Sequence, residues 1–289
     1  MSKLLNVCLF ACITNALVAK VDVVIPCIEK DLYVLEACIN GARSCIQDLG
    51  RIIVVSPKQY TDSAEWFNES DYPFSIEDVS DNLGKFGGVG NNPRRGWYYQ
   101  QLLKLYAPFV IPDISNDVLI IDADTVFLKP FSPVTANGAS IFNVWGFGNM
   151  FSSYISHMKR LYPGLECTKQ NVNPVVNHMI FQRDKLEILF SMVEEYHGKD
   201  FWKAFCNCVD TSTAKSVGKS FYVGASEYTI YFFFMNKYFP NDCITVVPKM
   251  DNRTPSFEAL EKFRKQGYDV VSLHHYYRES NDAKINKKM

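Results

Sequence analysis

The most constraining feature of the sequence is an apolar run, a helical repeat and a second apolar run in close succession. Val21–Pro26 and Arg51–Ser56 are short, mostly apolar segments, and a proline ends the first and follows the second. Between them, residues 31–46 place apolar side chains at spacings of three and four, which is typical of a helix. A strand, a helix and a strand in this order form a βαβ unit, with parallel strands and a right-handed crossover. The unit predicts an α/β fold with a mostly parallel central sheet and helices on both faces.

The pattern that follows extends this unit into one domain. Arg94–Tyr106 predicts a helix that ends before Pro108, and Val118–Ile121 predicts the next buried strand. Residues 80–93 are glycine-rich but lack the order of a dinucleotide-binding loop, so we expect a plain loop there. No repeat or linker divides residues 20–278, which predicts a single domain followed by a loose polar tail over residues 279–289. Further strands are predicted at Ser140–Val144, Val175–Phe181, Ile244–Val247 and Asp269–Leu273, and further helices at Met150–Leu161, Lys185–Tyr196 and Glu227–Tyr238.

Residues 1–19 have the pattern of a secretory signal peptide. They carry one lysine, then an apolar stretch from Leu4, then small residues at Ala16 and Ala19. The stretch is short for a membrane span and contains polar residues. A cleaved signal peptide is favoured, and a short uncleaved anchor or a short first helix stays open. The signal peptide predicts a secreted or secretory-pathway protein, whereas without it the protein would be cytoplasmic.

The charge balance excludes one class of partner. The chain has 289 residues, with 30 Lys and Arg against 31 Asp and Glu and a net charge of −1. Such a surface has no general attraction for nucleic acid. Nine cysteines at irregular spacing indicate neither a disulfide framework nor structural zinc. We therefore expect no nucleic-acid partner, and membrane contact only through residues 1–19.

Asp122 and Asp124 form an Asp-x-Asp motif directly after the apolar strand at residues 118–121. Residues two apart in extended chain point to the same side, so we expect the two carboxylates to converge. They would converge at the carboxyl edge of a parallel sheet, where α/β folds bind ligands. Two like charges need a cation between them, and a divalent ion would also bind a diphosphate. The motif predicts a metal-dependent diphosphate site, and the alternative is a pair of turn caps.

Two enzyme classes carry such an acidic pair after a strand. Haloacid-dehalogenase-type phosphatases have the pattern DxDx[TV], which residues 122–126 satisfy. In those enzymes the motif opens the fold on its first strand, whereas here a complete βαβ unit comes earlier. Those enzymes also need a later acidic pair, DD or GDxxxD, to hold magnesium, and neither pattern occurs after residue 124. The phosphatase is therefore the less favoured alternative.

The second class is the GT-A-fold glycosyltransferase, a Rossmann-like fold that the chain resembles over nearly its whole length past residue 20. Val21–Pro26 is similar to the first nucleotide-binding strand of this fold, and Leu119–Pro130 is similar to its metal-binding strand. The chain more specifically resembles a poorly characterised branch of Asp-x-Asp glycosyltransferase-like proteins from bacteria and large viruses. The blocks that carry this second resemblance are Gly96–Lys104, Val176–His178, Ser226–Tyr228 and His274-His275.

The resemblance implies a metal site. Asp124 would ligate the ion directly, and Asp122 would bind the donor ribose or share the ion. A histidine at the end of a late strand often completes such sites, and the alternation of residues 270, 272 and 274 makes His274 the candidate, with His275 second. Carboxylate, imidazole and diphosphate ligands suit Mn²⁺, with Mg²⁺ as the second choice. The alternative is a pair of histidines at a solvated strand end.

Five further residues are candidates for donor binding, catalysis or acceptor binding. Gln101 and Lys104 share one face of the helix before the metal strand, which favours contact with a donor sugar or phosphate, or else with solvent. Arg95 could contact a phosphate from the start of that helix. Glu227, at a helix start, would be the general base of an inverting transfer, or a carboxylate favoured by the helix dipole. His178 either contacts the acceptor or is a core histidine.

These expectations combine into a metal-dependent glycosyltransferase. It would move a sugar from a nucleotide-diphosphate donor to a glycan, lipid or protein acceptor that the sequence leaves open. The alternative is a non-catalytic secreted protein that binds glycans or nucleotide sugars on the same fold. The two differ in an observable way, because the binding protein would release no free nucleotide.

Overall fold

The computed structural model describes residues 20–84, 94–146, 152–169, 171–210, 224–254 and 256–274. The predicted signal peptide, most of the glycine-rich loop, His275 and the polar tail lie outside these residues. Within the described part of the chain, no helix is long and apolar enough to cross a membrane.

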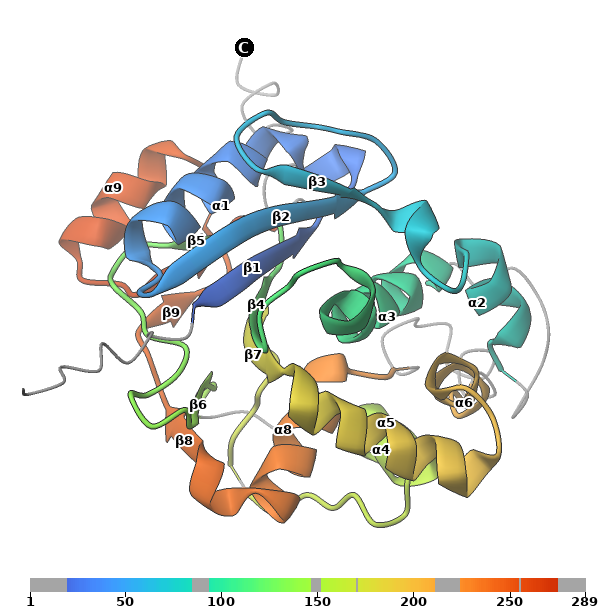
Figure 1. Ribbon diagram of the computed structural model, residues 1–289. Coiled ribbons are helices and arrows are strands. Elements are labelled where there is room, and N and C mark those ends of the chain that lie inside the picture. Colours follow the sequence, from blue (N-terminus) through green and yellow to red (C-terminus); the bar gives the residue numbers. More distant parts are fainter. Residues whose placement is uncertain are drawn as a thin grey trace, which may run out of the picture.

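A five-stranded sheet forms the centre of the molecule (Figure 1). Its strand order is β3 (Glu65–Asn68), β2 (Leu49–Ser56), β1 (Val21–Pro26), β4 (Asp117–Ile121) and β7 (His178–Gln182). The first four strands are parallel, and β7 is antiparallel to β4. The predicted α/β fold with a mostly parallel central sheet is therefore confirmed.

Helices cover both faces of this sheet. Helices α1 and α9 lie on one face, and α3, α5 and α6 lie on the other (Figure 1). The helices are α1 (Leu32–Cys45), α2 (Ile76–Asn82), α3 (Arg95–Val110), α4 (Ser152–Leu161), α5 (Arg183–His197), α6 (Phe201–Asn207), α8 (Glu227–Tyr238) and α9 (Glu258–Lys265).

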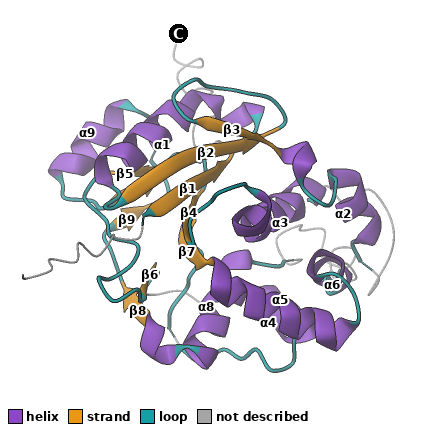
Figure 2. Cartoon of the chain, viewed as in Figure 1, coloured by secondary structure: helices purple, strands orange, loops and turns teal. Residues whose placement is uncertain are grey.

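Two small sheets complete the strands (Figure 2). One joins β5 (Thr125–Phe127), β10 (Val270–Ser272) and β9 (Met250–Asp251), and β10 is antiparallel to β5. The other pairs β6 (Ser140–Asn143) with β8 (Cys243–Val246) in parallel. Because β5 follows the Asp-x-Asp motif and β10 precedes His274, the first small sheet brings two distant parts of the chain to the same place.

The strand order creates a switch point between β1 and β4. From β1 the chain moves outward to β2 and β3, and it then returns to form β4 on the opposite side of β1. Helices that leave neighbouring strands in opposite directions open a crevice at the carboxyl ends of those strands, and α/β folds bind ligands there. Asp122 is the first residue after β4, so the motif lies at this switch point.

Helix α8 is apolar on all sides because the hydrophobic core encloses it. One hydrophobic cluster extends from β1 to β10 and includes most of α8, whose residues Glu227–Met235 are all buried. A helix that is apolar around its whole circumference is a helix enclosed by protein. A second, smaller cluster lies between α1, β5 and β10. There Gly41 allows close approach, since a Cβ atom at this position would lie 3.0 Å from the backbone of Phe127.

The structure corrects two predicted boundaries. Helix α3 continues through Pro108 to Val110 instead of ending before the proline. Pro108 lies in the last turn, where its missing N–H removes a single helical bond near the helix end. Strand β7 begins at His178 instead of Val175, because Asn177 has a positive φ of 66° that interrupts extended chain. Short or exposed elements were not predicted: β3, β5, β9, α2, α6 and α9.

Candidate active site

The Asp-x-Asp motif is a turn. The Thr125 N–H donates to the Asp122 carbonyl at 2.9 Å, and the Asp122 N–H donates to the Asn177 carbonyl at 2.9 Å. The Leu273 N–H donates to the Asp124 carbonyl at 2.8 Å, which joins the turn to the end of β10. The expectation of extended chain is therefore wrong, and in this turn the carboxylates of Asp122 and Asp124 contact different partners.

Asp122 belongs to a buried cluster formed with α3 and α8. Its Oδ1 lies 2.5 Å from Lys104 Nζ, and the Tyr228 hydroxyl donates to the same oxygen at 3.3 Å. Lys104 Nζ also donates to Glu227 Oε1 at 2.6 Å and to the Tyr228 hydroxyl at 3.2 Å. One ammonium therefore holds a carboxylate from the β4 edge and a carboxylate from the start of α8.

Gln101 completes this cluster one helical turn before Lys104. Its Oε1 accepts a hydrogen bond from the Glu227 N–H at 3.1 Å, while Ser226 caps α8 by accepting from the Thr229 N–H. Gln101 is 1% exposed, and its Nε2 has no hydrogen-bond partner within the described residues. Gln101, Lys104, Asp122 and Glu227, all predicted as site residues, are thus brought together, and Gln101 keeps a donor available for a ligand or a water molecule.

Burial governs the charges of the cluster. Burial raises the pKa of Glu227, against the opposite effect of the nearby Lys104 ammonium. Burial by itself would lower the pKa of Lys104, but the carboxylates of Asp122 and Glu227 hold that pKa well above its usual value. Burial and the Asp122 carboxylate also raise the pKa of the Tyr228 phenol. Lys104 is therefore a permanent buried cation at neutral pH.

Asp124 contacts the predicted third metal ligand. Its Oδ2 lies 2.9 Å from His274 Nδ1, and both side chains are mostly buried. The position of His274 depends on β10, where the Ser272 hydroxyl lies 3.0 Å from Thr125 Oγ1 and accepts from Asn177 Nδ2 at 3.0 Å. These contacts fix β10 beside the Asp-x-Asp turn, so His274 and Asp124 meet although 150 residues separate them.

The side-chain atoms of Asp124 and His274 suit a divalent cation as ligands, whereas the carboxylate of Asp122 is paired with Lys104. Among the residues that the structure describes, no three His, Cys, Asp or Glu side chains lie close enough to hold an ion together. A carboxylate and an imidazole are two of the ligands that such an ion needs. In this arrangement the remaining ligands would come from a bound molecule or from water.

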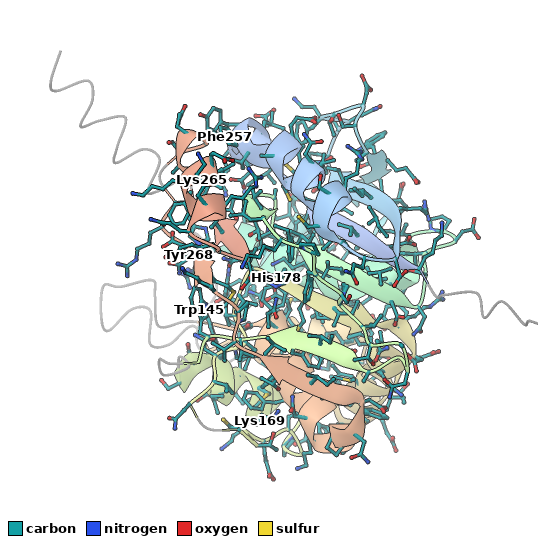
Figure 3. The ribbon with its side chains drawn as sticks, turned by 90° about the vertical axis from the view of Figure 1, so that its left-hand side faces the viewer. Trp145, Lys169, His178, Phe257, Lys265 and Tyr268 are labelled. Carbon is teal, nitrogen blue, oxygen red and sulfur yellow. The ribbon has the colours of Figure 1, made fainter. Side chains whose placement is uncertain are left out.

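The other two candidates have different surroundings. Arg95 is exposed at the first turn of α3. His178 is 2% exposed and lies inside the molecule (Figure 3). Its Nδ1 lies 3.0 Å from the Val176 carbonyl and its Nε2 lies 2.9 Å from Asn143 Nδ2. Burial lowers the pKa of His178 to about 4, and these contacts fit the core alternative that the sequence left open.

The sequence alone indicates no role for Tyr228, Asn177 or Ser272. Tyr228 touches both Lys104 and Asp122, and Asn177 and Ser272 hold the Asp-x-Asp turn against β10. The blocks Ser226–Tyr228 and Val176–His178 both carry the resemblance, which marks Tyr228 and Asn177 but not their functions. Ser272 carries no signal of its own, because its importance comes from a contact with Asn177 across 95 residues.

Three solved structures that the chain resembles are glycosyltransferases. Mouse xyloside xylosyltransferase 1 is 9% identical, with a TM-score of 0.40, and the match covers 88% of this chain and 97% of that one. The bifunctional glycosyltransferase WbbM is 13% identical, with a TM-score of 0.39 over 88% of this chain and 45% of that one. An active-site mutant of LgtC is 12% identical, with a TM-score of 0.41 over 87% and 86%.

Fewer relationships are found from the sequence than from the structure. No curated protein matches the chain at the sequence level. The resemblance to a bacterial and viral branch of glycosyltransferase-like proteins stays a prediction. Residues 43–246, which include β4, the Asp-x-Asp turn and all of α8, match the family described as "Family of unknown function (DUF6492)". The chain therefore belongs to the DUF6492 family.

Proposed function

We propose that this protein is a glycosyltransferase that takes a sugar from a nucleotide-diphosphate donor bound at the carboxyl edge of β1 and β4. The single observation that carries the proposal is the Asp-x-Asp turn at the switch point of a parallel sheet, with Lys104 on its first carboxylate and His274 on its second. This edge is where α/β folds bind nucleotides, and the resemblance of the sequence assigns the same motif to the donor.

Asp124 and His274 are the residues that would hold a divalent ion, with Mn²⁺ preferred over Mg²⁺. When bound, such an ion supplies positive charge for the leaving diphosphate. Because these two side chains provide only part of a coordination shell, we expect the ion and the nucleotide to bind together and each to strengthen the binding of the other. Metal alone should bind weakly.

Lys104, Gln101 and Asp122 form the other half of the proposed donor site. The ammonium of Lys104 fixes the orientation of the Asp122 carboxylate, which leaves its second oxygen for a donor hydroxyl. Gln101 Nε2, which has no hydrogen-bond partner among the described residues, would donate to the same ligand. Arg95 is exposed and could reach a phosphate from the start of α3.

Glu227 would act as general base only after it leaves Lys104. It is 4% exposed and its carboxylate accepts from Lys104 Nζ at 2.6 Å. This contact favours a second candidate function, a non-catalytic protein that binds a nucleotide sugar or a glycan. It is equally compatible with a retaining transferase, which needs no such base. His178 as an acceptor contact would require its two internal hydrogen bonds to break.

The test is a binding and turnover screen against a panel of nucleotide sugars with and without Mn²⁺. We expect at least one donor to bind in a metal-dependent way and to release free nucleotide when an acceptor is supplied. Asp124→Asn should abolish metal-dependent binding while the protein stays folded, since it removes charge at an edge and no core volume. Asp81→Asn, an exposed position on α2, is the matched control.

The outcome of the screen distinguishes the transferase from the non-catalytic binding protein. Metal-dependent binding without nucleotide release would select the non-catalytic alternative. Full activity in Asp124→Asn would contradict the assignment of the Asp-x-Asp turn. We also propose that residues 1–19 act as a secretory signal. N-terminal sequencing of the mature protein tests this: a mature N-terminus between Leu17 and Val21 is expected, and an intact Met1 or Ser2 would contradict it.

A further inference from the structure

A cavity of about 690 Å³ lies beside the carboxyl ends of β2 and β3. Its wall follows the chain from Asn68, the last residue of β3, to Asp78 in the first turn of α2, and Tyr99 of α3 forms part of the lining. The charged side chains that the described residues contribute to the lining are all acidic: Glu69, Glu77 and Asp78. Among the described residues, no lysine or arginine contributes to this wall.

Glu69 is the unusual member of this group. It is half-buried, and burial raises the pKa of its carboxyl group, with no second cause. Within the described residues the carboxylate has no ion pair and no hydrogen bond, in contrast to Glu65 of β3, which pairs with Arg51 at 2.7 Å. A half-buried carboxylate without a counter-charge costs folding free energy. Its environment is therefore one that a bound cation would stabilise.

Tyr72 provides an independent sign of a missing partner. It lines the same cavity and is 6% exposed, yet its hydroxyl has no hydrogen-bond partner among the residues that the structure describes. Buried hydroxyls in folded proteins nearly always have a partner. The negative charge of Glu69 also raises the pKa of the Tyr72 phenol, after burial and Tyr99, so the two groups are electrostatically coupled.

Aromatic rings and fixed turns give the cavity a defined shape. The rings of Tyr72 and Phe74 lie 5.9 Å apart, and those of Phe74 and Tyr99 lie 6.1 Å apart. The Tyr99 hydroxyl donates to the Glu69 carbonyl at 3.4 Å, and Ser75 and Asp78 form a reciprocal cap at the start of α2. The turn that carries Glu69 is thus anchored on both sides.

We propose that this cavity binds an organic ammonium ion through Glu69, with the aromatic rings around its apolar part. A divalent metal fits less well, because Asp78 is used in the helix cap, Glu77 is exposed, and no three acidic, His or Cys side chains converge among the described residues. An ammonium ion needs one carboxylate and gains from contact with aromatic faces. The class includes alkylamines, amino sugars and lysine side chains. The inference is independent of the function proposed for the Asp-x-Asp turn.

The experiment is a calorimetric titration of the full chain with n-butylammonium chloride at pH 7.5. A ligand of this size is expected to bind with a Kd of about 1 mM. The neutral alcohol 1-pentanol, of similar size and shape, should bind about tenfold more weakly or not at all, because it lacks the charge. Glu69→Gln should weaken butylammonium binding about tenfold or more, and Tyr72→Phe should weaken it less.

A matched control and a folding measurement complete the test. Asp71→Asn alters an exposed carboxylate in the same turn that does not line the cavity, and butylammonium binding should be unchanged. Glu69→Gln should raise the unfolding midpoint at neutral pH, because it removes an unpaired half-buried charge. Equal binding of pentanol and butylammonium, or full butylammonium binding in Glu69→Gln, would overturn the proposal, as would the absence of binding to the wild-type protein.

Discussion

The Lys104 ammonium lies 2.5 Å from Asp122 Oδ1, which ties helix α3 to the Asp-x-Asp turn. The same ammonium lies 2.6 Å from Glu227 Oε1 at the start of α8. Lys104 is 3% exposed, so both contacts are made largely out of water. The candidate active site is thus built around a single buried cation, and two carboxylates far apart in the sequence depend on it.

Loss of that cation should destabilise the protein strongly. Lys104→Met removes one partner of a buried ion pair and leaves Glu227 without a counter-charge, which should lower the free energy of unfolding by about 3–5 kcal/mol. Urea denaturation measures the change. The double variant Lys104→Met/Glu227→Gln should recover part of the loss. Lys58→Met, which breaks the exposed pair with Glu29, is the control and should change little. Wild-type stability in Lys104→Met would show that the cluster is not buried as described.

Stability should fall on acidification because two histidines are buried in the neutral form. Burial lowers the pKa of His178 to about 4 and that of His157 to about 3, from the usual 6.5. The unfolded chain therefore takes up protons that the folded protein does not. The contribution of the neutral histidines to the free energy of unfolding is complete above pH 6.5 and is lost as the pH falls toward 4. For His178 the difference corresponds to about 3 kcal/mol.

Denaturation curves between pH 7 and pH 4 test this prediction. His178→Gln and His157→Gln should each reduce the slope of unfolding free energy against pH, and the double variant should reduce it further. Each single variant is also expected to lose stability at pH 7, because His178 packs against Phe127 at 4.9 Å and His157 bonds the Phe205 carbonyl at 2.9 Å. An unchanged slope would contradict the buried neutral state.

His274 should contribute to metal affinity and little to folding. If it is a ligand beside Asp124, His274→Ala should weaken Mn²⁺ binding by about tenfold to a hundredfold, measured by titration in the presence of a nucleotide diphosphate. His197→Ala removes a histidine at the end of α5, outside the site, and should leave this affinity unchanged. Equal loss in both variants would point to a general effect on folding.

We expect the stability of the protein to depend on both the backbone conformation and the side chain of Asn177. Its φ of 66° lies in the left-handed region, which Asn tolerates better than other residues with a Cβ atom, and its Nδ2 donates to Ser272 Oγ at 3.0 Å. Asn177→Ala loses the hydrogen bond and adds backbone strain, so it should cost about 1–2 kcal/mol of unfolding free energy. Asn177→Gly loses the same bond but relieves the strain, and should be the more stable variant. Thermal unfolding ranks the two, and the reverse order would contradict the assigned conformation.

Much of the fold could be predicted because its signals are local. The apolar runs of β1 and β4 and the helical spacing of α1 are set by neighbouring residues, and these elements were predicted to within a few residues. Strand β3 was missed because it is short and partly exposed, so no apolar pattern marks it. Helix α9 was missed because it is short and mostly exposed, although Leu260 and Phe263 lie three residues apart and pack against the second cluster. Helix α3 was predicted too short because the effect of Pro108 depends on how close it lies to the helix end.

The sequence by itself determined which side chains could carry chemistry: an acidic pair after a buried strand, a Gln–Lys face on the preceding helix, and a glutamate at a helix start. Their partners were decided only by tertiary structure. The two carboxylates of the turn after β4 have different partners: α3 and α8 place Lys104 between Asp122 and Glu227, and β10 places His274 beside Asp124. The physical reason is that local spacing fixes the face of an element on which a side chain lies, whereas charge pairing in a buried site depends on how distant elements pack.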